Sequence, residues 1–173
     1  MSDTSKFCKD SAVTMTELVL PNDTNTLNNL MGGRLMHWMD VVSAISAIKH
    51  ANQTVVTASV DNISFTKPIH LGNVVTLKAF VTRAFKTSME VYIEVTAENV
   101  KANQKIDTNS AFFTFVALDQ DGNTVPVPEI VPESAFEKEL YDGALRRRQL
   151  RLVLGKRMKP EDANELKSIF KLD

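Results

Sequence analysis

The residue in this sequence best suited to chemistry is Asp40, a lone carboxylate within an apolar stretch. The stretch runs from Gly32 to Ile45 and predicts a buried helix. Removing an ionised carboxylate from water is costly unless partners hold it or its pKa moves, so such residues are enriched at sites of catalysis. There a carboxylate serves as a general base or as a nucleophile. The alternative, which stays open on the sequence alone, is a structural cap or ion pair.

Two glycines and an asparagine before Asp40 offer hydrogen-bonding groups. Gly32 and Gly33 lie where the helix is expected to begin, so their backbone N–H groups lack helical partners and a ligand can approach them closely. They are candidates for an oxyanion hole, although close packing of the helix explains two glycines equally well. Asn25 follows turn-forming residues, and its carboxamide both donates and accepts. A turn-forming role is the simpler interpretation of Asn25 from its surroundings alone.

The elements that must position these residues follow from hydrophobic periodicity. A helix from about Gly33 to Lys49 is apolar on nearly every side, which predicts a central position. Strands rich in β-branched and aromatic residues, separated by turn residues, are predicted at 13–20, 55–65, 73–85, 88–99 and 106–118. Apolar and polar residues alternate most cleanly over 88–99, so one face of that strand should meet the core. Together they predict an α+β fold in which an antiparallel sheet curls around one helix.

Composition limits the classes of protein to which the chain can belong. Its 173 residues, 43% hydrophobic and 24% charged, fit one globular domain with a proper core. A net charge of −1 gives no overall attraction to nucleic acid or to an anionic membrane. Cys8 is the only cysteine, which excludes a disulfide framework and a cysteine-based metal cluster. Neither a secretory signal nor a stretch of transmembrane length is found, so we expect a cytoplasmic protein.

The C-terminal part differs in charge pattern. From Pro128 onward acidic residues come first and basic residues follow, with leucines between them, which predicts one or two amphipathic helices. We therefore divide the sequence into a domain at 1–127 and a charged helical extension at 128–173. The order of charges suits the dipole of a solvated helix, and the alternative is a basic edge that meets ligand phosphates. RNA binding is disfavoured because no aromatic residues are interleaved to stack on bases.

Several short motifs occur in a specific order along the chain. They are Asp23-Thr24-Asn25, Gly32-Gly33, Met39-Asp40, the run from Val55 to Asp61, and the run from Thr87 to Val91. In this order they resemble the cytosolic acyl-CoA thioester hydrolases of the hotdog fold, and the resemblance covers about residues 12 to 125. That family wraps a sheet around a long central helix and pairs two such units into a continuous sheet with active sites at the seam. The resemblance implies a hotdog fold and hydrolysis of acyl-CoA to a free carboxylic acid and coenzyme A.

The resemblance also implies roles for individual residues. The family's catalytic Asp falls on Asp40 and its catalytic Asn on Asn25, with Gly32 and Gly33 placed to polarise the thioester carbonyl. The family draws the Asn and the Asp from different hotdog units, so a chain with one unit implies a homodimer with shared sites, and the family commonly forms trimers of dimers. No metal or other cofactor is implied, since coenzyme A is part of the substrate and product. Whether Asp40 acts as base or as nucleophile stays open.

Coenzyme A carries phosphates and an adenine, which call for basic side chains near the seam. The candidates are Arg83, Lys86, Lys101, Arg146, Arg147 and Arg148, each of which is also explained as a surface charge. The preferred length of the acyl chain cannot be predicted from the sequence.

Two other functions stay open. Hotdog hydratases and dehydratases pair a His with a carboxylate, and His37 lies on the same helical face as Asp40, although the order of the two residues is opposite to that signature. Hotdog domains also serve as acyl-CoA sensors in transcription regulators, a function that only the basic C-terminal helix favours here. Of the other histidines, His50 is expected to place a cation at the end of the helix, and His70 lies in a turn without an evident partner.

Overall fold

The structure is a computed structural model of residues 1–173, in which the backbone of 5–61, 63–65 and 67–170 is described. The chain divides into two compact units, Met1–Val131 and Pro132–Asp173. The boundary predicted between 127 and 128 lies just before the short strand β7 (Glu129–Val131). Because β7 pairs in parallel with β1 (Ser5–Phe7), these residues belong with the first unit.

The first unit is built on a five-stranded antiparallel sheet. In chain order its strands are β2 (Val13–Leu18), β3 (Thr54–Asp61), β4 (Val74–Ala84), β5 (Ser88–Asn99) and β6 (Gln104–Leu118). Across the sheet the order is β2-β4-β5-β6-β3, so β3 forms one edge and bonds to β6. The five predicted strands are confirmed, but the strand predicted at 55–65 is shorter and ends at Asp61.

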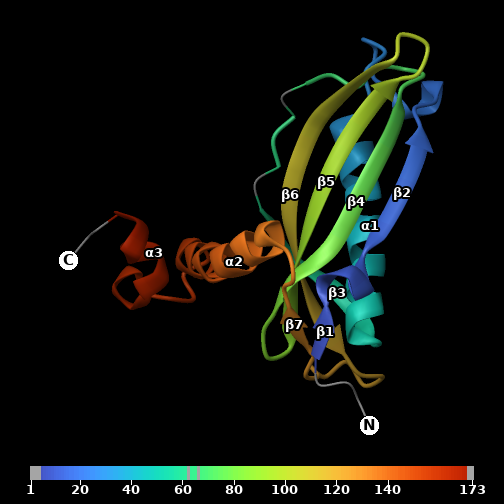
Figure 1. Ribbon diagram of the computed structural model, residues 1–173. Coiled ribbons are helices and arrows are strands. Elements are labelled where there is room, and N and C mark those ends of the chain that lie inside the picture. The colour runs from blue at the N-terminus through green and yellow to red at the C-terminus, as the bar shows by residue number, and fades with distance from the viewer. Residues whose placement is uncertain (1–4, 62, 66, 171–173) are drawn as a thin grey trace. The chain divides into compact units, whose positions relative to one another are not determined.

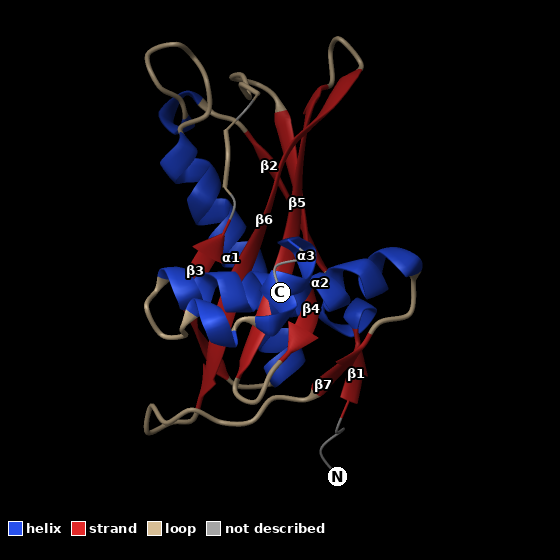
Figure 2. Cartoon of the chain, turned by 90° about the vertical axis from the view of Figure 1, so that its left-hand side faces the viewer, coloured by secondary structure: helices blue, strands red, loops and turns tan. Residues whose placement is uncertain are grey.

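Helix α1 (Gly32–Ala51) packs across one face of this sheet, and Figures 1 and 2 show the strands passing over it. Alternate residues of β5 face the helix, and Met89, Val91, Ile93 and Val95 are all fully buried. The predicted α+β hotdog arrangement is therefore confirmed. The prediction that α1 is buried nearly all round is wrong within one chain, because the side chains of Met36, Ile45 and Ile48 are 39%, 41% and 47% exposed.

The C-terminal end of α1 contains a buried neutral histidine. The His50 side chain is fully buried, and its Nε2 lies 2.8 Å from the backbone oxygen of Pro128. Burial lowers the pKa of His50, and the nearby Lys6 ammonium acts in the same direction. Lys6 itself donates from Nζ to the backbone oxygens of Lys49 and His50, at 3.0 and 2.8 Å. The predicted cation at His50 is therefore wrong, and Lys6 supplies the positive charge that suits the helix dipole.

The second unit consists of α2 (Ala135–Leu154), a short 3₁₀ turn (Pro160–Asp162) and α3 (Asn164–Phe170), which confirms the helical extension. Ser134 and Glu137 form a reciprocal cap at the start of α2, with hydrogen bonds of 2.9 and 3.1 Å. Gln149 accepts the backbone N–H of Leu166 at 3.0 Å, which joins α2 to α3. No helix in the described part of the chain is both long and apolar enough to span a membrane.

Candidate active site

Asp40 lies near the middle of α1, half-buried, and is hydrogen-bonded to the following strand. The hydroxyl of Thr57 on β3 donates to Asp40 Oδ1 at 2.8 Å. The other carboxylate oxygen, Oδ2, has no hydrogen-bond partner within the described residues. A hydroxyl fixes the direction of the carboxylate while leaving one oxygen free, which is what a base or a nucleophile requires.

The fold of β3 explains why Thr57 reaches the helix. Thr57 pairs with Phe115, a core residue, and directly opposed residues on neighbouring strands share a face of the sheet. The register between β3 and β6 then shifts before Ser59, leaving Ala58 unpaired. Such a bulge re-aims the side chains around it. Sequence reasoning missed Thr57 as a site residue, and the available signal was its place in the family motif from Val55 to Asp61.

Asn25 lies in a tight loop before α1. An isolated antiparallel β-bridge between Thr24 and Leu30 closes this loop. Its side-chain Oδ1 accepts the backbone N–H groups of Leu27 and Asn29, at 2.9 and 3.2 Å. The turn-forming role that the sequence suggested is therefore present. Two donors on Oδ1 also fix the orientation of the amide. The side-chain N–H groups of Asn25 are left exposed, without an acceptor in the described part of the chain, so the residue offers donors only.

Asp23 fastens this loop to the start of α1. Its carboxylate is almost fully buried, with Oδ1 2.7 Å from Nε of Arg34 and Oδ2 accepting the backbone N–H of Leu20 at 3.0 Å. The backbone oxygen of Asp23 accepts the N–H of Met31 at 2.9 Å. A buried carboxylate needs such partners, and here they hold the Asn25 loop beside the first turn of the helix.

Gly32 and Gly33 open α1, and their backbone N–H groups have no backbone acceptor within the described residues. A Cβ on Gly32 would lie 3.1 Å from the ring of Phe65, whereas one on Gly33 would have no atom within 4 Å. Close packing therefore explains the first glycine and not the second. Both amides point from the positive end of the helix dipole and are available to a negatively charged oxygen.

His37 is exposed, and no hydrogen bond joins its ring to Asp40 or to any other described residue. Both lie on α1, but the carboxylate bonds to Thr57 instead. The His–carboxylate pair of a hydratase is therefore not formed in the chain. Among the described residues, no group of three or more His, Cys, Asp or Glu side chains could hold a metal ion.

The basic residues of the first unit that were predicted to bind coenzyme A do not lie together. Arg83 lies on β4, opposite Glu90, with its guanidinium 5.9 Å from the centre of the Phe85 ring. Lys86 lies in the β4–β5 turn and Lys101 in the β5–β6 turn. Figure 1 shows these turns at opposite ends of the sheet, with α1 beginning at the β5–β6 end. Lys101 is thus at the end that carries the Asn25 loop.

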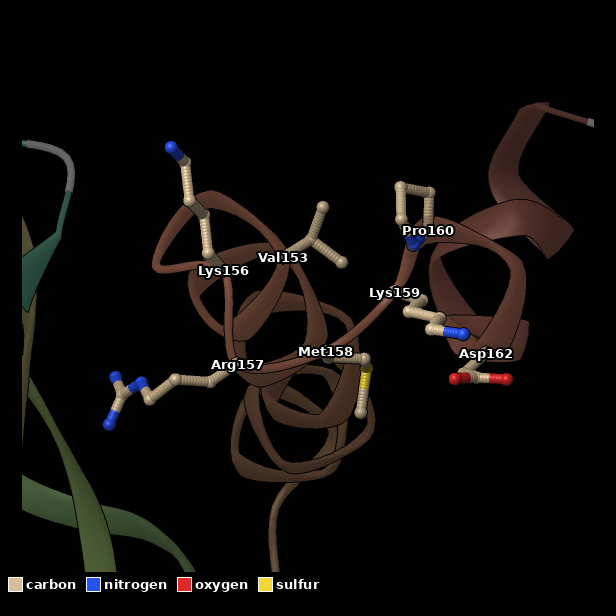
Figure 3. A pocket seen from close by; sticks show the side chains of 7 residues that line it. All are labelled: Val153, Lys156, Arg157, Met158, Lys159, Pro160 and Asp162. Carbon is tan, nitrogen blue, oxygen red and sulfur yellow. The ribbon is translucent and has the colours of Figure 1, made fainter.

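The three candidate arginines of the second unit lie on α2. Arg147 donates to the backbone oxygen of Leu140 at 2.6 Å. Burial lowers the pKa of Arg148, and the neighbouring Arg151 and Arg157 lower it further. A hollow of about 470 Å³ lies beyond the end of α2 and is lined by Val153, Lys156, Arg157, Met158, Lys159, Pro160 and Asp162. In Figure 3 the charged ends of Lys156 and Arg157 point away from those of Lys159 and Asp162. Arg146, Arg147 and Arg148 are not among its lining residues.

Comparison with known proteins places the chain in a family. The thioesterase superfamily pattern matches residues 27–102. A Bacillus subtilis protein, named an uncharacterised acyl-CoA thioester hydrolase, YkhA, is 42% identical over 143 residues, 83% of each chain. The chain belongs to the acyl-CoA thioester hydrolases. The family predicted from the order of motifs is therefore confirmed.

Two solved acyl-CoA thioester hydrolases have closely similar folds. A hexameric acyl-CoA thioesterase without ligand has a TM-score of 0.83 and 39% identity, over 85% of this chain and 94% of its own. The acyl-CoA hydrolase of Staphylococcus aureus, in complex with butyryl coenzyme A, coenzyme A and coenzyme A disulfide, has a TM-score of 0.81 and 37% identity, over 88% and 94%. Variants of that hydrolase with an asparagine, an aspartate or a threonine replaced by alanine are also known, and these three residues are 15 and 17 positions apart. Asn25, Asp40 and Thr57 have the same spacings.

Proposed function

We propose that this protein hydrolyses acyl-CoA thioesters to a free carboxylic acid and coenzyme A, at active sites that two copies of the chain build together. The observation that carries the proposal is the hydrogen bond from Thr57 to Asp40, which orients a carboxylate and leaves its Oδ2 open. Hydrolysis of a thioester needs a base or nucleophile, and donors for the oxyanion. The chain supplies the first with Asp40 and the second with Asn25 and the start of α1.

The proposed site needs two copies because the reacting groups of one copy are separated. Gly33 and Asp40 are seven positions apart on α1, which is about 10 Å along the helix axis. Oxyanion donors must lie about 3 Å from the carbonyl oxygen, and the attacking group about 3 Å from its carbon. In the proposed site one copy supplies Asp40 and Thr57, and its partner supplies Gly32 and Gly33 together with Asn25, whose place in the partner follows from the family resemblance.

The surfaces of the first unit support this pairing. Within the described sheet β3 bonds only to β6, so its outer edge is free, and a free strand edge readily pairs with another chain. Val56 on this strand is 45% exposed, and Ile45 and Ile48, which lie about one turn apart on α1, are also exposed. We propose that two copies join through β3 and these side chains, and that such dimers assemble further into a trimer of dimers.

In the proposed reaction Asp40 either takes a proton from a water molecule that attacks the thioester carbonyl carbon, or attacks that carbon itself to form a mixed anhydride, which water then hydrolyses to restore Asp40. In both cases the carbon–sulfur bond breaks, the thiolate of coenzyme A leaves and the carboxylic acid is released. The N–H groups of the partner's loop and helix start donate to the oxygen that becomes negatively charged. Coenzyme A enters as part of the substrate and leaves as product, and no other cofactor is proposed. The basic residues that hold its nucleotide stay a prediction, as does a cytoplasmic location.

The direct test is release of free thiol from a series of acyl-CoA esters, from acetyl to palmitoyl, by wild type and by Asp40→Asn. Turnover that depends on Asp40 is expected, and the series reveals the preferred acyl chain. No turnover by wild type with any ester would refute the activity.

Sharing of the site is tested by mixing two impaired variants, Asp40→Asn and Asn25→Ala. Each mixed dimer has one site with both residues intact, so random exchange should restore about a quarter of the wild-type rate. No recovery, once mass spectrometry has verified exchange, would show that the two residues do not come from different copies.

A further inference from the structure

A hydrogen bond between two side chains, His70 and Asn29, holds the Asn25 loop from outside. Nδ1 of His70 lies 2.7 Å from Oδ1 of Asn29. A carboxamide oxygen only accepts, so Nδ1 carries the proton and donates. Two backbone bonds flank this contact, from the N–H of Leu30 to the oxygen of Ile69 at 2.7 Å and from the N–H of Leu71 to the oxygen of Asn28 at 3.0 Å. The contact between the loop and the His70 turn is therefore continuous.

Asn29 in turn fixes both the backbone and the side chain of Asn25. Its backbone N–H donates to Asn25 Oδ1 at 3.2 Å, and its backbone oxygen accepts the N–H of Asn25 at 2.9 Å. Because Oδ1 is held, the opposite end of the amide, with its two N–H groups, has a set direction. Any movement of Asn29 changes where those donors point.

The His70 turn is itself rigid, which makes it a suitable support. Asn73, only 6% exposed, accepts the backbone N–H of His70 on its Oδ1 at 2.9 Å and donates its own backbone N–H to the oxygen of His70 at 3.0 Å. Gly72 has a φ of +79°, which a glycine adopts without strain and which this tight turn requires. The turn leads directly into β4, so the support is anchored on the sheet.

We infer that His70 is a positioning residue for the proposed hydrolysis, acting through Asn29 on the direction of the Asn25 donors. The inference rests on the proposed function, since it concerns the role of Asn25 in that reaction. His70 does not touch the reacting atoms in this scheme. Its ring is exposed and borders a hollow of about 280 Å³, so substituting it opens no gap in the core. The effect should therefore fall on kcat and not on folding.

Two substitutions of His70 distinguish the role of Nδ1 from that of Nε2. The amide nitrogen of His70→Asn lies about where Nδ1 lies, whereas that of His70→Gln lies nearer the place of Nε2. We expect His70→Asn to retain the wild-type kcat within about twofold, and His70→Gln and His70→Ala to lose about fivefold, the effect of one ordinary hydrogen bond. KM, the melting temperature and the oligomeric state should be unchanged in all three. Equal activity of the Asn and Gln variants would overturn the inference.

The same substitution in an Asn25→Ala background shows whether His70 acts through Asn25. There His70→Gln should cause no further loss, because the donors that it would misdirect are already gone. An undiminished fivefold loss would overturn the inference while leaving the hydrolase intact. If Asn25→Ala alone keeps the wild-type rate, the proposed role of Asn25 fails and the inference with it. Dependence on Asn25 without dependence on His70 would overturn the inference alone.

Discussion

The hydrogen bond from Thr57 to Asp40 gives a prediction whose size follows from the structure. Replacing Thr57 by valine removes the hydroxyl but keeps the β-branched shape that suits a strand. A hydrogen bond to a charged group contributes about 1.5–3 kcal/mol. Because Asp40 is half-buried and Thr57 is exposed, water replaces part of the lost bond, so the lower end applies. About 1.5 kcal/mol corresponds to roughly a tenfold fall in kcat.

The measurement is thiol release from the acyl-CoA ester that wild type hydrolyses fastest, with kcat and KM determined separately. Thr57→Ser is the matched control, since it keeps the hydroxyl and should retain most of the activity. The bond orients a reacting group and does not hold the substrate, so KM should change little. The melting temperature should also stay the same, because the side chain is exposed.

Two results would refute this reasoning. A Thr57→Val variant within about twofold of the wild-type kcat would show that the bond does not contribute to catalysis. An equal loss in the serine and valine variants would show that the effect comes from the methyl group on β3 and not from the hydroxyl.

Three further predictions concern the scaffold that holds the site. Burial lowers the pKa of His50 from 6.5, so the unfolded chain takes up the proton at a higher pH than the folded chain does. The stability that neutral His50 contributes is therefore present above pH 6.5 and is lost as the pH falls below it. Between about pH 7.5 and 5.5, the free energy of unfolding measured in urea should fall less for His50→Gln than for wild type, because glutamine keeps the donor to the Pro128 oxygen and carries no charge. An equal fall in the two proteins would contradict this account. Gly32→Ala should have a lower melting temperature than Gly33→Ala, because a Cβ on Gly32 lies 3.1 Å from the Phe65 ring and one on Gly33 has no atom within 4 Å, and equal values in thermal denaturation would show that packing does not distinguish them. Arg34→Met leaves the buried Asp23 carboxylate without its ion pair and should lower the free energy of unfolding by about 1–2 kcal/mol in urea titration; an unchanged value would mean that the pair does not fasten the loop.

Long segments with a regular pattern of apolar residues were predictable from the sequence. Short strands whose partners are far away in the sequence were not. The bounds of β5 were predicted as observed because its alternation is unbroken over Ser88–Asn99. The pair β1 and β7 was missed, since each has three residues and they come from opposite ends of the first unit. The apolar character of α1 was recognised, but one sequence cannot tell whether its own sheet or a second copy covers each side.

Some residues of the candidate site could likewise be recognised from the sequence, and others could not. Asp40 stood out because a carboxylate in an apolar helix is unusual, and the family motifs pointed to Asn25 and the glycines. The hydroxyl of Thr57 was missed because threonine is ordinary in a strand and its bond depends on how β3 packs against α1. The partner of His70 was missed for a similar reason, since 41 positions separate it from Asn29. Contacts between side chains on different elements depend on tertiary geometry that no local pattern encodes.

On each side of the proposed seam the hydrogen bonds leave one kind of group unused, an acceptor on Asp40 and donors on Asn25, and these groups are complementary. Asp40 has one oxygen held by a donor and the other free to act, whereas Asn25 has its oxygen held by two donors and its N–H groups free. A single copy therefore presents an unused acceptor on the helix and unused donors on the loop, and the backbone amides at the start of α1 lie about 10 Å from Asp40 along the helix axis. Pairing through β3 would bring each acceptor opposite the partner's donors and cover the exposed apolar side chains of α1 at the same time. Excluding water there strengthens the attraction between the donors and a developing oxyanion, so the same association that completes the fold would complete the chemistry.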